Sequence, residues 1–108
     1  MQTTDYLIAA KAKLGIESDY ALAMKLGVTR SAVSRFQLRK GVFGDDVALS
    51  VAEILGRNPL EVIAAANAER TTDPKMKSKW KAIAEKFSAS FLNLLSGAGP
   101  HVEPLYMR

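Results

Sequence analysis

The chain has 108 residues, of which 48% are hydrophobic and 24% are charged, so it has enough apolar material for one buried core and is not a disordered chain. It has no cysteine and one histidine, His101, which excludes a disulfide scaffold, thiol catalysis, a cysteine-ligated zinc site and the usual Ser-His-Asp triad. The net charge is +4, and the surplus lies in residues 74–108, because residues 1–73 carry nine basic and nine acidic side chains. We find no paired carboxylates, glycine-rich phosphate loop or nucleophile signature, and we expect neither an enzyme nor a cofactor or metal site.

Helix start and stop signals divide the first 41 residues into three short helices, and strand signals are nearly absent. Each helix is expected to begin at a hydroxyl residue that caps it and to be followed by a glycine. The third helix is expected to run from about Thr29 to Lys40. The expected caps are Thr3 or Thr4, Ser18 and Thr29, and the glycines that follow the three helices are Gly15, Gly27 and Gly41.

The rest of the chain contains signals for three more helices. A fourth is expected from about Asp45 to before Gly56, and Asn58-Pro59-Leu60-Glu61 combines an N-cap residue, a proline at the first helical position and an acid at the third, close to a capping box. Asp73-Pro74 begins a sixth and longest helix that reaches about Ser96. The prediction is therefore an all-α protein with a five-helix domain over residues 1–72, a sixth amphipathic helix over 73–96 and a mobile tail over 97–108.

Residues 19–38 have the pattern of two short helices that pack closely across a tight turn. Ala23 is small where the helices would touch, and Gly27 lies where the turn needs a left-handed backbone. The shared apolar core is expected from Leu22, Leu26, Val28, Val33 and Phe36.

The second helix of this pair is expected to present a face rich in arginine and serine. Arginine matches the paired acceptors of guanine in the major groove, and serine can bond to bases or phosphates. Lys25, Arg39 and Lys40 are interpreted as phosphate contacts, and the start of the helix at Thr29 offers free backbone N–H groups to a phosphate. The outward residues of the helix are Arg30, Ser31, Ser34, Arg35 and Leu38.

The charge pattern of this region supports the same interpretation. The segment from Tyr20 to Gly44 contains five basic residues and no acid, although the domain around it is neutral. A local charge of this kind predicts a polyanionic partner at one face.

These residues resemble the Cro/cI-type helix-turn-helix family over about residues 4–70. The resemblance rests on the spacing of Ala23 and Gly27, on Val28-Thr29, on Ser31-Ala32-Val33-Ser34-Arg35 and on the helix Ala52-Glu-Ile-Leu-Gly56. The half from Asp45 to Arg70 is more narrowly similar to small phage-related regulators, including repressors of filamentous prophages. The resemblance implies a five-helix DNA-binding domain, a homodimer and a palindromic operator.

The resemblance also assigns roles to residues. The base-contacting positions of the family correspond to Arg30, Ser31, Ser34 and Arg35, with Leu38 as a further candidate. Two positions depart from the family. Asp19 stands where the family often has glutamine, and an acid there would repel a phosphate, while Phe36 replaces a frequent tryptophan.

The predicted sixth helix carries an apolar stripe whose steps of three and four residues are close to heptad spacing. Three interpretations are open: a dimer interface, a cover for the core of its own chain, and an amphipathic membrane helix with lysines at lipid headgroups. The stripe comprises Met76, Trp80, Ile83, Phe87, Phe91 and Leu94, and the dimer interface is assigned to its last five members.

The sequence as a whole favours a cytoplasmic, sequence-specific DNA-binding transcriptional regulator, and a repressor rather than an activator. No signal peptide and no apolar run near 20 residues is present, so no membrane partner is expected. The alternative is a protein-interaction module, such as an antitoxin or anti-regulator. Regulation is expected through protein concentration, dimerisation or a protein antagonist.

Overall fold

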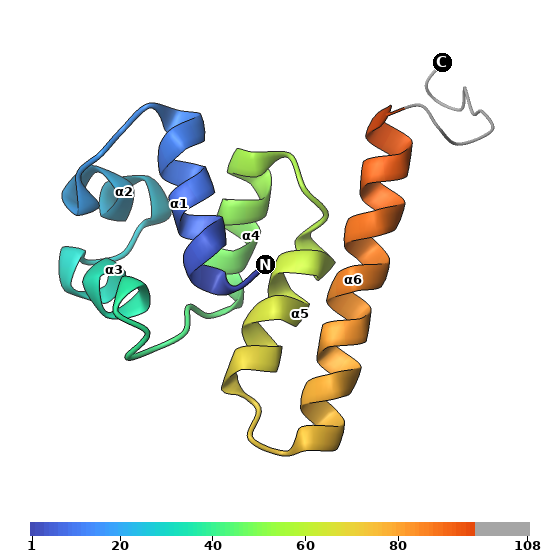
Figure 1. Cartoon of the computed structure of the whole chain (residues 1–108). Coiled ribbons are helices and arrows are strands. Elements are labelled where there is room, and N and C mark those ends of the chain that lie inside the picture. The colour runs from blue at the N-terminus through green and yellow to red at the C-terminus, as the bar shows by residue number, and fades with distance from the viewer. Residues whose placement is uncertain (97–108) are drawn as a thin grey trace.

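The computed structural model describes the backbone of residues 1–96 and the side chains of residues 1–88, so the predicted tail over 97–108 lies outside the described residues. The described chain is all-α, and it has six helices and no strand. Figure 1 shows α2 and α3 at one end of the molecule, α1 and α4 in the middle and the antiparallel pair α5 and α6 at the other end. The helices are α1 (Thr3–Leu14), α2 (Asp19–Leu26), α3 (Arg30–Gln37), α4 (Asp45–Leu55), α5 (Pro59–Arg70) and α6 (Pro74–Ser96).

The expected start of α1 is wrong by one or two residues. Gln2 is the N-cap, and its backbone N–H donates to the carboxylate of Asp5 over 2.9 Å. Thr3 is the first helical residue and is buried, because its backbone N–H and its hydroxyl both donate to the carboxylate of Glu69 in α5, each over 2.6 Å. The side chain expected to cap α1 therefore joins it to α5.

The turn between α2 and α3 forms as the sequence predicts. Ser18 and Thr29 are the N-caps, and their hydroxyls accept from the backbone N–H groups of Ala21 and Ala32 over 3.0 Å. Gly27 has a left-handed backbone with φ 70°, which glycine adopts without steric cost. This turn fixes the angle at which α3 leaves α2.

The end of α3 differs from the prediction, because the helix stops at Gln37 rather than at about Lys40. Arg39, not Gly41, takes the left-handed conformation, with φ 63°. The backbone N–H of Lys40 then donates to the carbonyl of Arg35 over 2.9 Å, which closes the last turn as in a Schellman motif.

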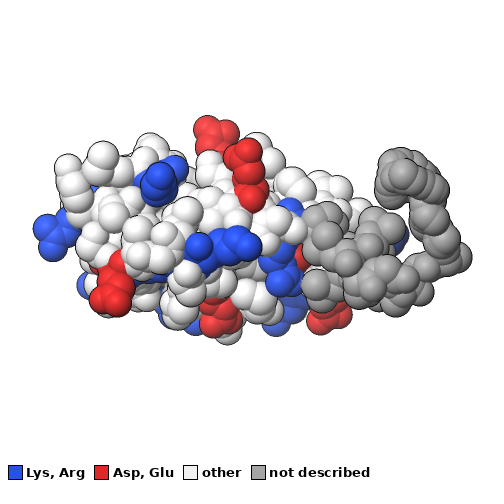
Figure 2. All heavy atoms as spheres, turned by 90° about the horizontal axis from the view of Figure 1, so that it is seen from above, with Lys and Arg blue, Asp and Glu red and all other residues white. Residues whose placement is uncertain are grey.

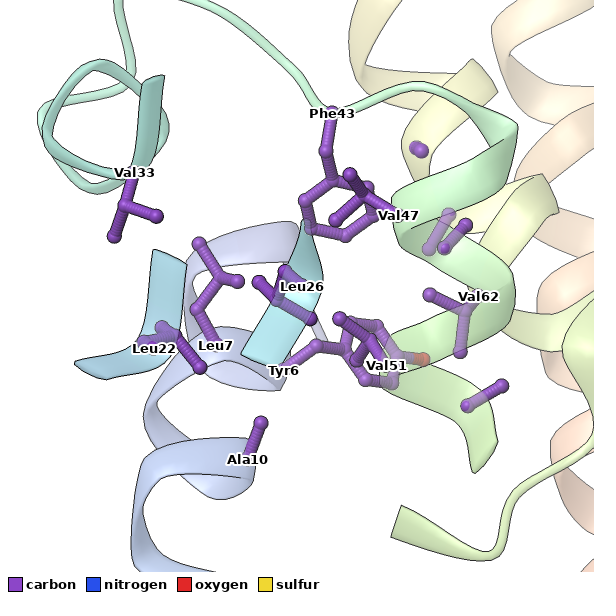
Figure 3. Close-up of a cluster of buried hydrophobic side chains, with 14 of the residues drawn as sticks. Tyr6, Leu7, Ala10, Leu22, Leu26, Val33, Phe43, Val47, Val51 and Val62 are labelled. Carbon is purple, nitrogen blue, oxygen red and sulfur yellow. The ribbon is translucent and has the colours of Figure 1, made fainter. Parts of the chain in front are cut away.

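The core lies between α1, α2, α4 and α5, and α3 contributes one fully buried side chain to it. Figure 3 shows Val33 extending from α3 toward Leu7 and Leu22. Phe43 belongs to the loop before α4 and is completely buried, and its ring meets Phe36 edge-on with centroids 5.9 Å apart. The sequence did not single out Phe43, which fixes the loop after α3 to the core.

Asn58 caps α5 as expected, and its side chain accepts from the N–H of Leu60 over 2.9 Å. Glu61 does not complete a capping box, because its side chain is 2% exposed and points inward.

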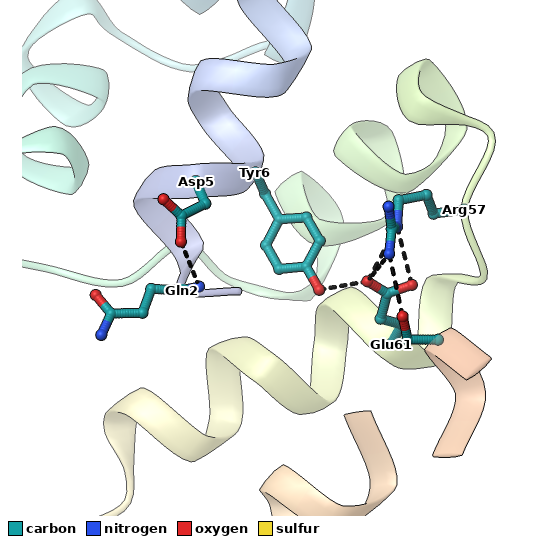
Figure 4. Close-up of polar contacts among 6 residues, drawn as sticks. Gln2, Asp5, Tyr6, Arg57 and Glu61 are labelled. Carbon is teal, nitrogen blue, oxygen red and sulfur yellow. Dashed lines mark hydrogen bonds and ion pairs between the residues drawn. The ribbon is translucent and has the colours of Figure 1, made fainter. Parts of the chain in front are cut away.

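Figure 4 shows the carboxylate of Glu61 between Tyr6 and Arg57. The Tyr6 hydroxyl donates over 2.5 Å, Arg57 Nε donates to both carboxylate oxygens over 3.0 Å, and Arg57 Nη2 also donates to Ser88 of α6 over 3.1 Å. We call these four residues the buried acid network.

Burial and hydrogen bonding stabilise the neutral form of Tyr6. Loss of solvent around the phenol and the hydrogen bond to Glu61 raise the pKa of Tyr6 well above its ordinary value of 10.0. The bond to Glu61 also raises the pKa of Arg57, so the arginine remains charged. The network joins α1, α5 and α6 through one carboxylate.

The start of α6 is confirmed, because the Asp73 carboxylate accepts from the N–H of Met76 over 3.1 Å. The helix lies along α5, and Lys77 Nζ donates to the carbonyl of Ala68 over 2.8 Å. Ala84 packs against the core, but no side chain over residues 74–88 is fully buried. No helix in the described part of the chain is long and apolar enough to cross a membrane.

Candidate nucleic-acid interface

The outer face of α3 is polar and open to solvent. Arg30, Ser31 and Arg35 are exposed and Ser34 is half-buried, while Val33 on the opposite face is completely buried. The helix is thus held by one apolar face and leaves the other uncovered. The four side chains that the sequence assigned to base contacts lie together on one exposed helix.

The two arginines of this face differ in their surroundings. Arg30 is the first residue of α3, and its guanidinium makes no hydrogen bond or ion pair with any described residue. The guanidinium of Arg35 lies against Gly41, and its Nη2 is 3.1 Å from the point where a Cβ at that position would be. The Arg35 side chain therefore lies next to the loop that follows its own helix.

The residues assigned to phosphate contacts lie in α2 and at the two ends of α3. Lys25, in the last turn of α2, and Lys40, after α3, are both exposed. Arg39 is exposed too, but its guanidinium donates to the side chain of Gln2 at the start of α1. The hydroxyl of Thr29 is used as the N-cap of α3.

Asp19 stands at the start of α2, where an acid was expected to repel a phosphate. Its carboxylate accepts from Lys11 Nζ of α1 and from Gln37 Nε2 of α3, each over 3.0 Å. The lysine opposes the negative charge, and the bond to Gln37 ties the end of α3 to α2. Asp19 therefore has a structural role that the sequence did not indicate.

The region from Tyr20 to Gly44 is distinguished by its charge. It carries five basic residues and no acid, and all five are exposed. Figure 2 shows one face of the molecule, on which basic and acidic side chains are interspersed. The five basic residues are Lys25, Arg30, Arg35, Arg39 and Lys40.

Large apolar side chains also reach solvent in α2 and just after α3, and among them the sequence indicated only Leu38. Leu38, just after α3, is 63% exposed, and Tyr20 and Met24 of α2 are 62% and 67% exposed. Tyr20 and Met24 are four residues apart and so share one face of the helix. They therefore form a small patch of exposed apolar surface on α2.

The apolar stripe of α6 is only partly covered. Trp80 and Phe87 are half-buried and lie outside the core cluster, while Met76 and Ile83 are 43% and 36% exposed. The side chains of Phe91 and Leu94 lie outside the described residues.

The other side of α6 faces the start of α1, with an open groove of 480 Å³ between them. Ala65, Ala68 and Ala84 line this groove together with charged side chains of α5 and α6. The helix therefore covers α5 and leaves an open groove beside it.

Within residues 1–88, no three His, Asp or Glu side chains are placed to hold a metal ion together. No family model, curated protein or solved structure matches this chain.

Proposed function

We propose that this protein is a sequence-specific DNA-binding transcriptional regulator with a Cro/cI-type helix-turn-helix, and that α3 enters the major groove. The observation that carries the proposal is the exposed outer face of α3, which presents two arginines and two serines and belongs to a sequence segment, residues 20–44, that contains no acid. An α-helix fits the major groove, where each base pair presents a distinct pattern of donors and acceptors.

The side chains divide into two roles under this proposal. Arg30, Ser31, Ser34 and Arg35 reach base edges, and arginine contacts guanine O6 and N7. Lys25 and Lys40 contact phosphates on either side of α3. The guanidinium of Arg39 leaves the side chain of Gln2 and contacts a phosphate oxygen instead. Phosphate contacts position the protein, and base contacts determine the sequence it prefers.

The protein binds its operator as a homodimer in this proposal, and α6 supplies the contact between subunits. The exposed fractions of Met76 and Ile83 support this role, because a partner would cover them along with the half-buried Trp80 and Phe87. A two-fold axis places two copies of α3 in successive major grooves, about 34 Å apart, and so predicts a palindromic operator. A dimer on a promoter excludes polymerase, so we favour a repressor.

Selection of bound fragments from a random duplex pool tests the DNA-binding proposal directly. We expect enrichment of a palindrome with guanine in each half-site. The measured affinity should fall steeply with salt, because each phosphate contact releases counterions. A pool that is not enriched, with binding that persists at low salt, would instead indicate a DNA-architectural protein without sequence preference.

A protein-interaction module, such as an antitoxin or anti-regulator, is the second candidate, and one observation favours it. Tyr20, Met24 and Leu38 expose apolar surface beside the polar face of α3, as a protein-binding surface does. Such a module has no affinity for duplex DNA at low salt, and this single measurement separates the two candidates.

The dimer is tested by a substitution in the apolar stripe with a matched control on the same helix. Ile83→Glu places a charge in the expected contact, whereas Ala82→Glu places it at an exposed neighbouring position. We expect sedimentation to show a dimer for the wild type and Ala82→Glu and a monomer for Ile83→Glu. Equal association of all three proteins would mean that α6 does not form the contact between subunits.

A further inference from the structure

Gly41 differs from the glycines that follow α1, α2 and α4. Those three have positive φ and no atom within 4 Å of an added Cβ, so their backbone conformation accounts for glycine. Gly41 has no positive φ, so the sign of its φ does not account for glycine at this position. An added Cβ would instead meet the guanidinium of Arg35, with Nη2 at 3.1 Å, Cζ at 3.8 Å and Nε at 3.9 Å.

The chain brings Gly41 to this position through the bend that ends α3. The left-handed backbone of Arg39 reverses the direction of the chain, and the N–H of Lys40 bonds to the carbonyl of Arg35. Phe43, buried two residues later, then anchors the loop in the core. Gly41 is thus held beside the Arg35 side chain by contacts on both sides of it.

We propose that Gly41 is a positioning residue for Arg35, and that Arg35 is the side chain of α3 that is oriented in advance to read guanine. The inference rests on the proposed function and adds to it a residue that contacts no base itself. Arginine loses much rotamer freedom when it is held in one geometry. A guanidinium already placed against the loop loses less of that freedom on binding, so its guanine contact is stronger and more selective.

Arg30 provides the contrast on the same face. It is exposed and makes no hydrogen bond or ion pair with a described side chain, so its orientation is set only when DNA binds. Substitution at Gly41 should therefore change base preference at the position read by Arg35 and leave the position read by Arg30 unchanged.

A methyl group at residue 41 should act on Arg35 and not on the fold. The atoms it meets are the far end of a flexible, exposed side chain, which moves by a few tenths of an ångström or leaves the site. Replacing a glycine by alanine in an allowed conformation also reduces the entropy of the unfolded chain. We therefore expect Gly41→Ala to fold with unchanged or slightly higher thermal stability.

The experiment is a double-mutant cycle on the operator selected from the random duplex pool. We expect Gly41→Ala to lower operator affinity about tenfold, a part of the loss caused by Arg35→Ala, and to leave affinity for unrelated duplex unchanged. In an Arg35→Ala background, Gly41→Ala should have no further effect on operator affinity. Replacing the guanine whose preference depends on Arg35 by 7-deazaguanine, which lacks the N7 acceptor, should remove the difference between wild type and Gly41→Ala.

Gly44→Ala is the matched control, because Gly44 lies in the same loop with no atom near an added Cβ. Its operator affinity should equal that of the wild type. Equal affinity of Gly41→Ala and wild type, or the same loss with and without Arg35, would overturn the role of Gly41 while leaving DNA binding intact. Absence of any duplex binding by the wild type would overturn the proposed function and this inference together.

Discussion

Arginine serves two opposite purposes in this molecule, and a comparison of the buried acid network with the face of α3 shows the difference. Arg57 has a structural role, because its guanidinium bonds to both oxygens of Glu61 and to Ser88. Arg30 and Arg35 make no ion pair among the described side chains and remain exposed.

The difference shows where charge stabilises this fold and where charge is available for binding. Glu61 is a buried anion that needs Arg57 and Tyr6, so removal of one partner should lower the free energy of unfolding. An exposed arginine without an acidic partner adds little to stability but remains available to a polyanion. Substitutions in the two regions should therefore change different measurements.

Glu61→Ala should give the largest effect in the molecule. It leaves the buried Tyr6 hydroxyl without its acceptor and Arg57 without its ion-pair partner. Because the Arg57 side chain is 23% exposed and can turn to water, we expect a loss of about 3 kcal/mol, the lower end for a broken buried pair. Urea unfolding measures it, and the control Glu53→Ala, at an exposed position of α4, should stay within about 0.5 kcal/mol of wild type. Equal losses in both variants would contradict the structural role of the network.

Arg30→Ala and Arg35→Ala should show the opposite profile. Each should lower operator affinity by about 1–3 kcal/mol and relax selection at one base, with no change in urea unfolding. Lys40→Ala should instead weaken binding to all sequences equally and reduce the salt dependence of affinity. If the two arginine variants weaken operator and unrelated duplex by the same factor, they contact phosphates and not bases.

The sequence predicts the exposed region better than the buried network, for a physical reason. Caps, glycine turns and periodic apolar residues are local signals, and they were sufficient to place all six helices and the open face of α3. The bond between Tyr6 and Glu61 joins residues 55 positions apart, and local spacing contains no information about it. For the same reason Glu61 was interpreted as a capping acid and Thr3 as an N-cap, whereas both bond across the fold.

In the candidate site, too, local sequence patterns did not predict a contact that depends on the path of the chain. The local pattern identified Arg35 as an outward residue, but its contact with Gly41 depends on where the chain turns after α3. The sequence indicated only that Gly41 lies beyond the end of this helix, whereas Arg39 is the residue that adopts the left-handed conformation. An arginine there is uncommon, because side chains with a Cβ are strained at positive φ. No composition or spacing signal marks such a residue.

The pH dependence of stability in Tyr6→Phe tests the role of Tyr6 in the buried acid network. At neutral pH, loss of the bond to Glu61 should cost about 1 kcal/mol. Because the pKa of Tyr6 is raised in the folded state, the stability it contributes is complete below its ordinary pKa of 10.0 and is lost as the pH rises above that value. Urea unfolding at roughly pH 8 and pH 11 should therefore show a smaller alkaline loss for Tyr6→Phe than for wild type. Equal alkaline losses would mean that Tyr6 ionises as easily in the folded chain as in the unfolded one.

Arg39 has a bonded side chain, as Arg57 has, but it is exposed, as Arg30 and Arg35 are, and its substitution should change stability less than substitution of Glu61 or Tyr6 does. Its side chain bonds to Gln2 at an exposed site, where such a contact contributes little, while its backbone is held at positive φ. Arg39→Gly should relieve the backbone strain and raise stability by about 0.5 kcal/mol, less than the full strain because glycine also gains entropy in the unfolded chain. Arg39→Ala loses the same guanidinium but keeps the strain, so it should show no gain. Both variants remove one cation from the segment 20–44 and should weaken binding to all duplexes alike. Urea unfolding should show a gain in stability for Arg39→Gly alone, and this difference would assign the gain to the backbone.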